Sequence, residues 1–188
     1  MSSDLSSKDL KEFKRLLKLK IEYRRLIELR FCRWLHMDCP QHYSLRRLAR
    51  RFGVSKDTVS KWIKDDESYN KIMKLSIEHP TFMEDLQNQI WTSLIPALIS
   101  LGKSPEECKQ KEEERYRETL KQRILEGYEP YDPEGLRDWY SPNRIYNDEG
   151  DIAFATGVSV ETVKKNDALI IELSKEIQAE GKVPIQRD

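Results

Sequence analysis

The sequence predicts an all-α protein. Apolar residues recur at helical spacing over long segments, several serines stand where they would cap a helix, and only 7 glycines occur among 188 residues. The chain is 38% hydrophobic and 35% charged, as is typical of soluble globular proteins. Its longest apolar run, around residues 94–101, is interrupted by Pro96 and is far shorter than the roughly 20 residues that span a membrane.

The N-terminal third is predicted to hold a series of basic helices. Residues 8–37 contain neither proline nor glycine, and their apolar positions fit one long helix or two consecutive ones that end before Pro40. Ser44 is placed to cap a helix over residues 45–52, which Gly53 closes. Ser55 is placed to cap the next helix, over residues 56–64, and residues 71–78 are expected to form a further helix before Pro80.

The remainder is expected to continue as helices around one irregular connector. Residues 82–101 form an apolar helical stretch that needs a partner, with Pro96 placed to kink it. A capping box at residues 104–107 opens a helix to Glu126, with Gly127 as its stop. Residues 128–146 are rich in tyrosine and proline, which favours a packed connector, and helical patterning returns over 151–180. We therefore divide the chain into a basic domain (1–80), a helical hairpin (81–127) and a C-terminal unit (128–188).

A net charge of zero conceals a strong asymmetry. Residues 1–64 contain 17 Lys and Arg against 7 Asp and Glu, a charge of +10, which leaves 16 against 26, or −10, for residues 65–188. A basic N-terminal third attracts a polyanion, whereas the acidic remainder is suited to protein partners or self-assembly.

Residues 45–64 carry the pattern of a helix-turn-helix, a motif in which two short helices cross closely. Ala49 is the small residue at the crossing, Gly53 supplies the left-handed turn, and Val54 follows it as an apolar plug. Val59 and Trp62 form the buried face of the second helix. The basic charge around this motif predicts binding to double-stranded DNA.

Helical geometry then identifies the predicted contacts. Six residues of the second helix and its cap are expected to face the major groove: Ser55, Lys56, Asp57, Ser60, Lys61 and Lys64. The preceding helix places cations where they can clamp the phosphate backbone, at Arg46, Arg47, Arg50 and Arg51.

A weaker second copy of the motif lies 104 residues further along. Residues 157–165 repeat the pattern of residues 53–61, but Thr156 and Asn166 replace the two aromatic positions. Carboxylates gather just before it, at Asp148, Glu149 and Asp151, so we favour a structural or protein-binding role for this unit over DNA binding.

The sequence indicates no catalytic, cofactor or metal site. It has no phosphate loop, nucleophile elbow or metalloprotease motif, and three histidines offer little material for a general base. Cys32, His36, Cys39 and His42 are spaced too tightly for a usual four-ligand zinc site. Three cysteines without a disulfide framework, and no apolar signal-peptide core, lead us to expect a cytoplasmic protein.

The segment GVSKDTVSKWIKDDESY, residues 53–69, resembles the small terminase subunit of phages and related prophage helix-turn-helix proteins. The resemblance covers roughly residues 20–80. It implies recognition of viral DNA by the lysines and arginines named above, assembly of a homo-oligomer through residues 82–127, and presentation of the acidic part to the large ATPase-nuclease subunit. It implies no catalysis by this chain.

Two other interpretations stay open at this point. A transcriptional regulator, or the DNA-binding subunit of a transposition or replication system, would read a bipartite site with both helix-turn-helix units, and residues 159–165 would then touch DNA. An adaptor would bind a partner protein through its acidic helices.

Overall fold

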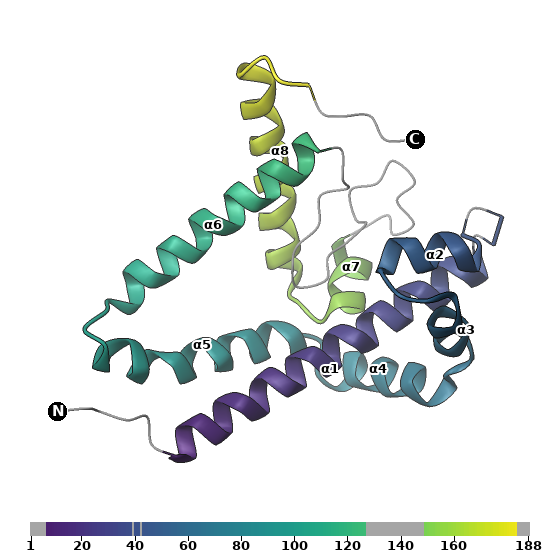
Figure 1. The fold of residues 1–188 in the computed structure, drawn as a ribbon, viewed down its shortest axis with the longest axis horizontal. Coiled ribbons are helices and arrows are strands. Elements are labelled where there is room, and N and C mark those ends of the chain that lie inside the picture. Colours follow the sequence, from purple (N-terminus) through teal and green to yellow (C-terminus); the bar gives the residue numbers. More distant parts are fainter. Residues whose placement is uncertain (1–6, 39, 42, 127–148, 184–188) are drawn as a thin grey trace.

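The computed structural model describes residues 7–38, 40–41, 43–126 and 149–183, and the regular elements of this part of the chain are all helices, which confirms the predicted fold class (Figure 1). In chain order they are α1 (Ser7–Asp38), α2 (Leu45–Phe52), α3 (Lys56–Lys64), α4 (Asp66–Glu78), α5 (Phe82–Ser100), α6 (Pro105–Leu125), α7 (Glu149–Thr156) and α8 (Val160–Ala179).

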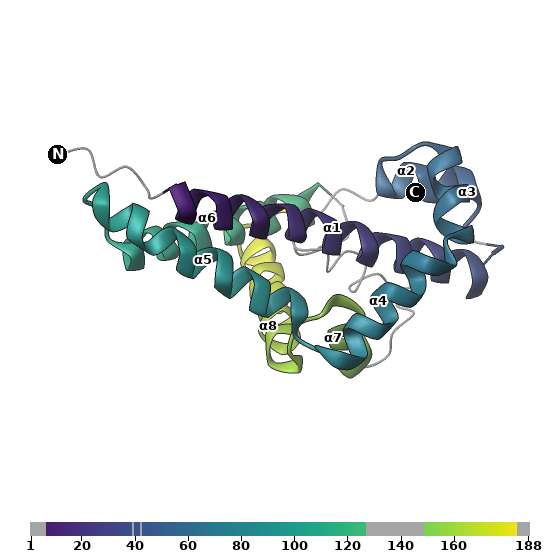
Figure 2. The same cartoon turned by 90° about the horizontal axis from the view of Figure 1, so that it is seen from below.

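Helix α1 is the scaffold of the larger core. It is a single helix of 32 residues, because no proline or glycine interrupts residues 8–37. Its C-terminal half buries Leu26, Ile27 and Leu29 completely, and α2, α3, α4, α5 and α7 all pack against it. The N-terminal half lies beside α5 and extends away from α2 and α3 (Figure 2).

Helix α4 begins at Asp66, five residues earlier than the sequence analysis expected. Asp65 ends α3 and also caps α4, because its carboxylate accepts a hydrogen bond of 2.9 Å from the amide of Ser68. Because Asp65 is both the last cap of α3 and the first cap of α4, it is the only residue between the two helices.

Helices α6 and α8 pack against each other in parallel around a second, smaller core. Leu120 and Ile124 of α6 meet Ile170, Leu173 and Ile177 of α8. Arg117 pairs with Glu172 at 2.9 Å and Lys121 with Glu180 at 2.5 Å, so the later cation of α6 meets the later carboxylate of α8, as a parallel arrangement requires. Although α5 and α6 are neighbours in sequence, they diverge from the turn that joins them, and α5 packs on α1 (Figure 1).

A buried arginine joins three helices of the larger core. Arg30 of α1 is 3% exposed. Its guanidinium donates to the carbonyls of Phe154 (3.1 Å) and Ala155 (2.8 Å) in the last turn of α7, and to the carbonyl of Ile72 (2.9 Å) and the hydroxyl of Ser76 (2.6 Å) in α4. Its positive charge also faces the negative end of the α7 dipole. Arg30 therefore fixes the C-terminal unit to the N-terminal one, across the predicted boundaries at residues 80 and 127.

Most predicted helix limits match the described helices within a few residues. Pro96 lies inside α5, and Ser104 caps α6 by accepting from the amide of Glu107 at 3.3 Å. The predicted connector (128–146), the predicted stop at Gly127 and Asp148 lie outside the described residues. No helix in the described ranges is long and apolar enough to cross a membrane.

Candidate nucleic-acid interface

The turn between α2 and α3 has the local geometry that its sequence predicts. The hydroxyl of Ser44 accepts from the amide of Arg47 at 3.3 Å and caps α2. Gly53 adopts a left-handed conformation, with φ of 65°, and the amide of Val54 donates to the carbonyl of Ala49 at 3.0 Å. The chain therefore reverses tightly at Gly53 and starts α3 three residues later, at Lys56.

Helix α3 is held by one apolar face. The hydroxyl of Ser55 accepts from the amide of Thr58 at 3.1 Å and starts the helix. Val59 is completely buried, and Trp62 is 8% exposed and meets the ring of Phe52 edge-on at 6.1 Å between centroids. Burial of these side chains against α1 and α2 fixes which side of α3 faces solvent.

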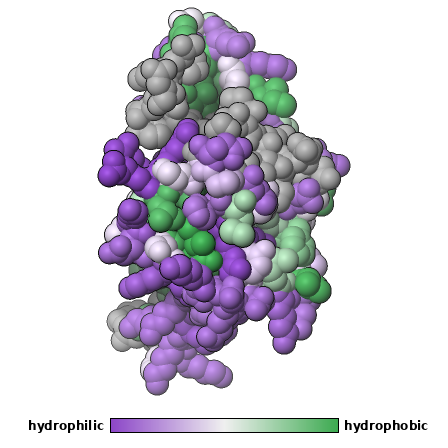
Figure 3. Space-filling view, turned by 90° about the vertical axis from the view of Figure 1, so that its right-hand side faces the viewer, coloured by the Kyte–Doolittle hydropathy of each residue, from purple (hydrophilic) through white to green (hydrophobic). Residues whose placement is uncertain are grey.

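The solvent side of α3 carries the predicted contact residues. Ser55, Lys56, Asp57, Lys61 and Lys64 are exposed, and Ser60 is half-buried. Within the described residues, Lys56, Lys61 and Lys64 make no ion pair, so their charges are available to a ligand. Figure 3 views the molecule from the end where α2 and α3 lie and shows a mostly hydrophilic surface.

The four arginines of α2 divide into two pairs. Arg46 and Arg50 are exposed. Arg47 and the half-buried Arg51 lie over the ring of Tyr43, at 5.6 and 5.4 Å from its centroid, and Tyr43 is itself only 6% exposed. Tyr43 was not among the residues predicted from the sequence, although its position directly before the capping Ser44 was an available signal. Its ring restrains two cations that we expect at the phosphate backbone.

Comparisons with known proteins assign neither a family nor a function to this chain. No family model, curated protein or solved structure matches this chain. Its function is therefore inferred from the geometry and charge of the chain itself.

The turn between α7 and α8 repeats the geometry of the first turn. Gly157 has φ of 71°, the amide of Val158 donates to the carbonyl of Ala153 at 3.3 Å, and Ser159 caps α8 by accepting from the amide of Thr162 at 3.2 Å. The internal similarity seen in the sequence thus extends to the backbone of both turns.

The surroundings of the two turns differ. A Cβ at Gly53 would meet nothing within 4 Å, whereas one at Gly157 would overlap the ring of Phe82 from α5. The amides of Met83 and Glu84 donate to the carbonyl of Gly157 at 2.9 and 3.1 Å. The second turn therefore lies beneath the start of α5, while the first is open.

Glu84 of α5 completes this contact at the N-terminus of α8. Its carboxylate accepts from the amide of Ser159 at 2.6 Å and from the hydroxyl of Thr162 at 3.0 Å. Burial raises the pKa of Glu84, but these hydrogen bonds outweigh the burial and leave the pKa below its ordinary value. A carboxylate at this position fills the site where a DNA phosphate would approach the start of α8, which favours a structural role for the second unit.

Only Cys32 and His36 of the cysteine and histidine cluster lie within the described residues. Cys32 is completely buried in the core, and burial raises the pKa of its thiol to about 12. The ring of His36 faces the carbonyl of Tyr43 at 3.3 Å, and Cys39 and His42 lie outside the described residues. Among the described residues, no group of three or more His, Cys, Asp and Glu side chains could hold a metal ion.

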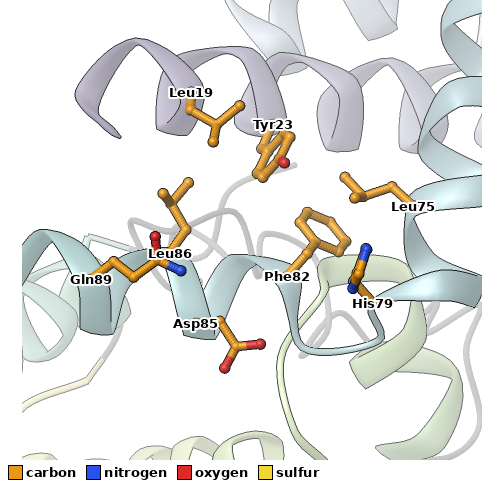
Figure 4. Close-up of a pocket in the computed structure, with 8 residues that line it drawn as sticks. All are labelled: Leu19, Tyr23, Leu75, His79, Phe82, Asp85, Leu86 and Gln89. Carbon is orange, nitrogen blue, oxygen red and sulfur yellow. The ribbon is translucent and has the colours of Figure 1, made fainter. Parts of the chain in front are cut away.

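A small pocket lies between α1, α4 and α5, away from α3 (Figure 4). Its volume is about 180 Å³, and Leu19, Tyr23, Leu75, Phe82 and Leu86 supply its apolar walls. Asp85 lies at its edge, where the carboxylate accepts a hydrogen bond of 2.8 Å from Thr81 and points away from the apolar side chains. Within the described residues, no hydrogen bond or ion pair joins His79 to Asp85 across the pocket.

Proposed function

We propose that this chain binds double-stranded DNA, with α2 and α3 as a helix-turn-helix and α3 as the helix that enters the major groove. One observation carries the proposal: Lys56, Lys61 and Lys64 project from one rigidly held helix face without ion-pair partners among the described residues. Lysines can donate to base edges and phosphates, and the exposed Arg46 and Arg50 on α2 add backbone contacts.

We further propose that the chain is the DNA-recognition subunit of a viral genome-packaging machine, of the small-terminase type that residues 53–69 resemble. Such a subunit forms a homo-oligomer, binds the viral DNA and interacts with a large ATPase-nuclease partner, and it has no catalytic activity of its own. Assembly is supported by the second half of α5, where Ile99 is 62% exposed, and by the adjoining Leu101, which is 70% exposed. The acidic C-terminal part is the surface offered to the large partner.

The alternative of a two-unit regulator is less well supported by the environment of α8. Its N-terminal turn is covered by Phe82 and capped by Glu84, so a phosphate approaching this turn would meet a carboxylate. Helix α8 also presents Glu161 beside Lys165, at 3.1 Å, which neutralises one of its two candidate cations.

The test is the triple variant Lys56→Ala, Lys61→Ala and Lys64→Ala, assayed for affinity to duplex DNA at fixed salt. We expect a loss of about 100-fold, because three contacts of roughly 1 kcal/mol each are removed and 1.4 kcal/mol corresponds to tenfold. Light scattering should give the same solution mass as the wild type, since the exposed α3 face lies apart from α5.

The matched control removes three exposed lysines from α6 and α8: Lys109→Ala, Lys111→Ala and Lys175→Ala. This control changes the net charge equally, so it separates the site from general electrostatic attraction. Affinity of the α3 variant within threefold of the control would contradict the proposed interface, and would favour the adaptor hypothesis.

A further inference from the structure

The N-terminal half of α1 carries a surplus of positive charge that the proposed interface does not use. Residues 7–25 contain eight Lys and Arg but only three Asp and Glu. Two of these carboxylates are already paired, Glu12 with Arg15 at 2.7 Å and Glu22 with Lys71 of α4. The exposed Lys11, Lys14 and Lys18 form no ion pair with a described residue.

These three lysines form a line along one side of the helix, which we call the α1 lysine stripe (Lys11, Lys14 and Lys18). Spacings of three and four residues place neighbouring side chains on the same face, and Arg25, seven residues after Lys18, continues it. At a rise of 1.5 Å per residue, the distance from Lys11 to Arg25 along the axis is about 21 Å.

The α1 lysine stripe leads toward α3. Arg33 of α1 pairs with Asp66, which follows the end of α3, at 2.7 Å, and Glu22 of α1 pairs with Lys71 of α4. Arg25 lies between Glu22 and Arg33 on α1, and α1 extends from there to the opposite end of the molecule (Figure 2). Helix α1 therefore carries the stripe away from the end of α3.

The chemistry of the α1 lysine stripe favours a phosphate backbone over a protein partner. Lysine is depleted from protein interfaces, because burying its ammonium group is costly. Duplex DNA offers one negative charge per roughly 1.7 Å of its axis, so solvated lysines can contact it while releasing condensed counterions. The exposed apolar side chains of Leu10 and Ile21 flank the stripe. A protein partner would bind through these apolar side chains, whereas DNA would bind through the lysines.

We propose that the α1 lysine stripe is a second contact surface for duplex DNA, which holds phosphates beyond the segment bound by α3. This inference depends on the proposed function, because it extends the same bound duplex. The distance of about 21 Å from Lys11 to Arg25 corresponds to about six base pairs at 3.4 Å each. The stripe supplies affinity without reading sequence, since lysines that contact phosphate carry no base information.

The experiment measures how the affinity for a duplex of about 25 base pairs depends on salt concentration, for the full chain and its variants. In Lys11→Gln, Lys14→Gln and Lys18→Gln, the slope of log affinity against log salt should become shallower by about two to three units, because each lost phosphate contact removes about 0.9. Arginine at the same three positions should retain the wild-type slope. The control variant Lys109→Gln, Lys111→Gln and Lys175→Gln should also retain it.

The outcomes separate this inference from the proposed function. A wild-type chain that does not bind duplex DNA would overturn both. Wild-type binding with an unchanged slope in the stripe variant would overturn the inference alone. An unchanged slope together with a changed solution mass would identify the stripe as a protein contact, which also overturns it.

Discussion

Replacing Gly157 with alanine is expected to lower the free energy of unfolding by about 3 kcal/mol. An L-residue in the left-handed region costs about 1–2 kcal/mol, and forcing a methyl group into a packed core costs about 1–3 kcal/mol more. The added Cβ would overlap the ring of Phe82, which is 5% exposed and is held edge-on against Tyr23 at 5.1 Å between centroids. Moving the ring away from Gly157 would therefore disturb its edge-on contact with Tyr23.

Gly53 provides the matched control for this prediction. It has nearly the same conformation, with φ of 65°, but open space where the new methyl group would lie. Gly53→Ala should therefore cost only about 1–2 kcal/mol, the backbone contribution. Urea unfolding of both variants measures the difference, and equal losses at the two positions would show that Phe82 does not restrict the second turn.

Replacing Arg30 with methionine should destabilise the protein by about 3–4 kcal/mol. Hydrogen bonds from a charged donor contribute about 1.5–3 kcal/mol each, and the buried acceptors on α4 and α7 would lose this partner. Methionine fills similar space, so the loss reports the hydrogen bonds more than a cavity. Because Arg30 fixes the C-terminal unit, we also expect the substitution to accelerate amide hydrogen exchange in α7 more than in α2.

The control for Arg30 is Arg15→Met, which breaks an exposed ion pair with Glu12 on the same helix. Exposed pairs of this kind contribute about 0–1 kcal/mol, so this variant should unfold almost like the wild type. If Arg30→Met were no more destabilised than Arg15→Met, the guanidinium would not be the link between α1, α4 and α7.

Local signals allowed much of the fold to be predicted from the sequence. Ser44, Ser55 and Ser104 all cap helices as expected, because a serine hydroxyl satisfies an amide only two or three residues away. The start of α4 was missed because Asp65 lies in a run of acidic residues that has no apolar pattern of its own.

Contacts between distant segments could not be predicted in this way. Arg30 lies in a helix whose other cations are mostly at the surface, and its acceptors are 42 to 125 residues away in the chain. The same holds for Phe82 and Gly157, whose contact depends on how α5 meets the C-terminal unit. At the candidate interface, in contrast, the exposed face of α3 followed from local periodicity, because Val59 and Trp62 define its buried side.

The most direct test of the central claim is a lysine acetylation footprint of the wild-type chain, measured by mass spectrometry with and without duplex DNA. We predict that DNA slows acetylation of Lys56, Lys61 and Lys64, while Lys109, Lys111, Lys164 and Lys165 react at unchanged rates. Unchanged reactivity at the three α3 lysines, or protection of Lys164 and Lys165 in their place, would contradict the account.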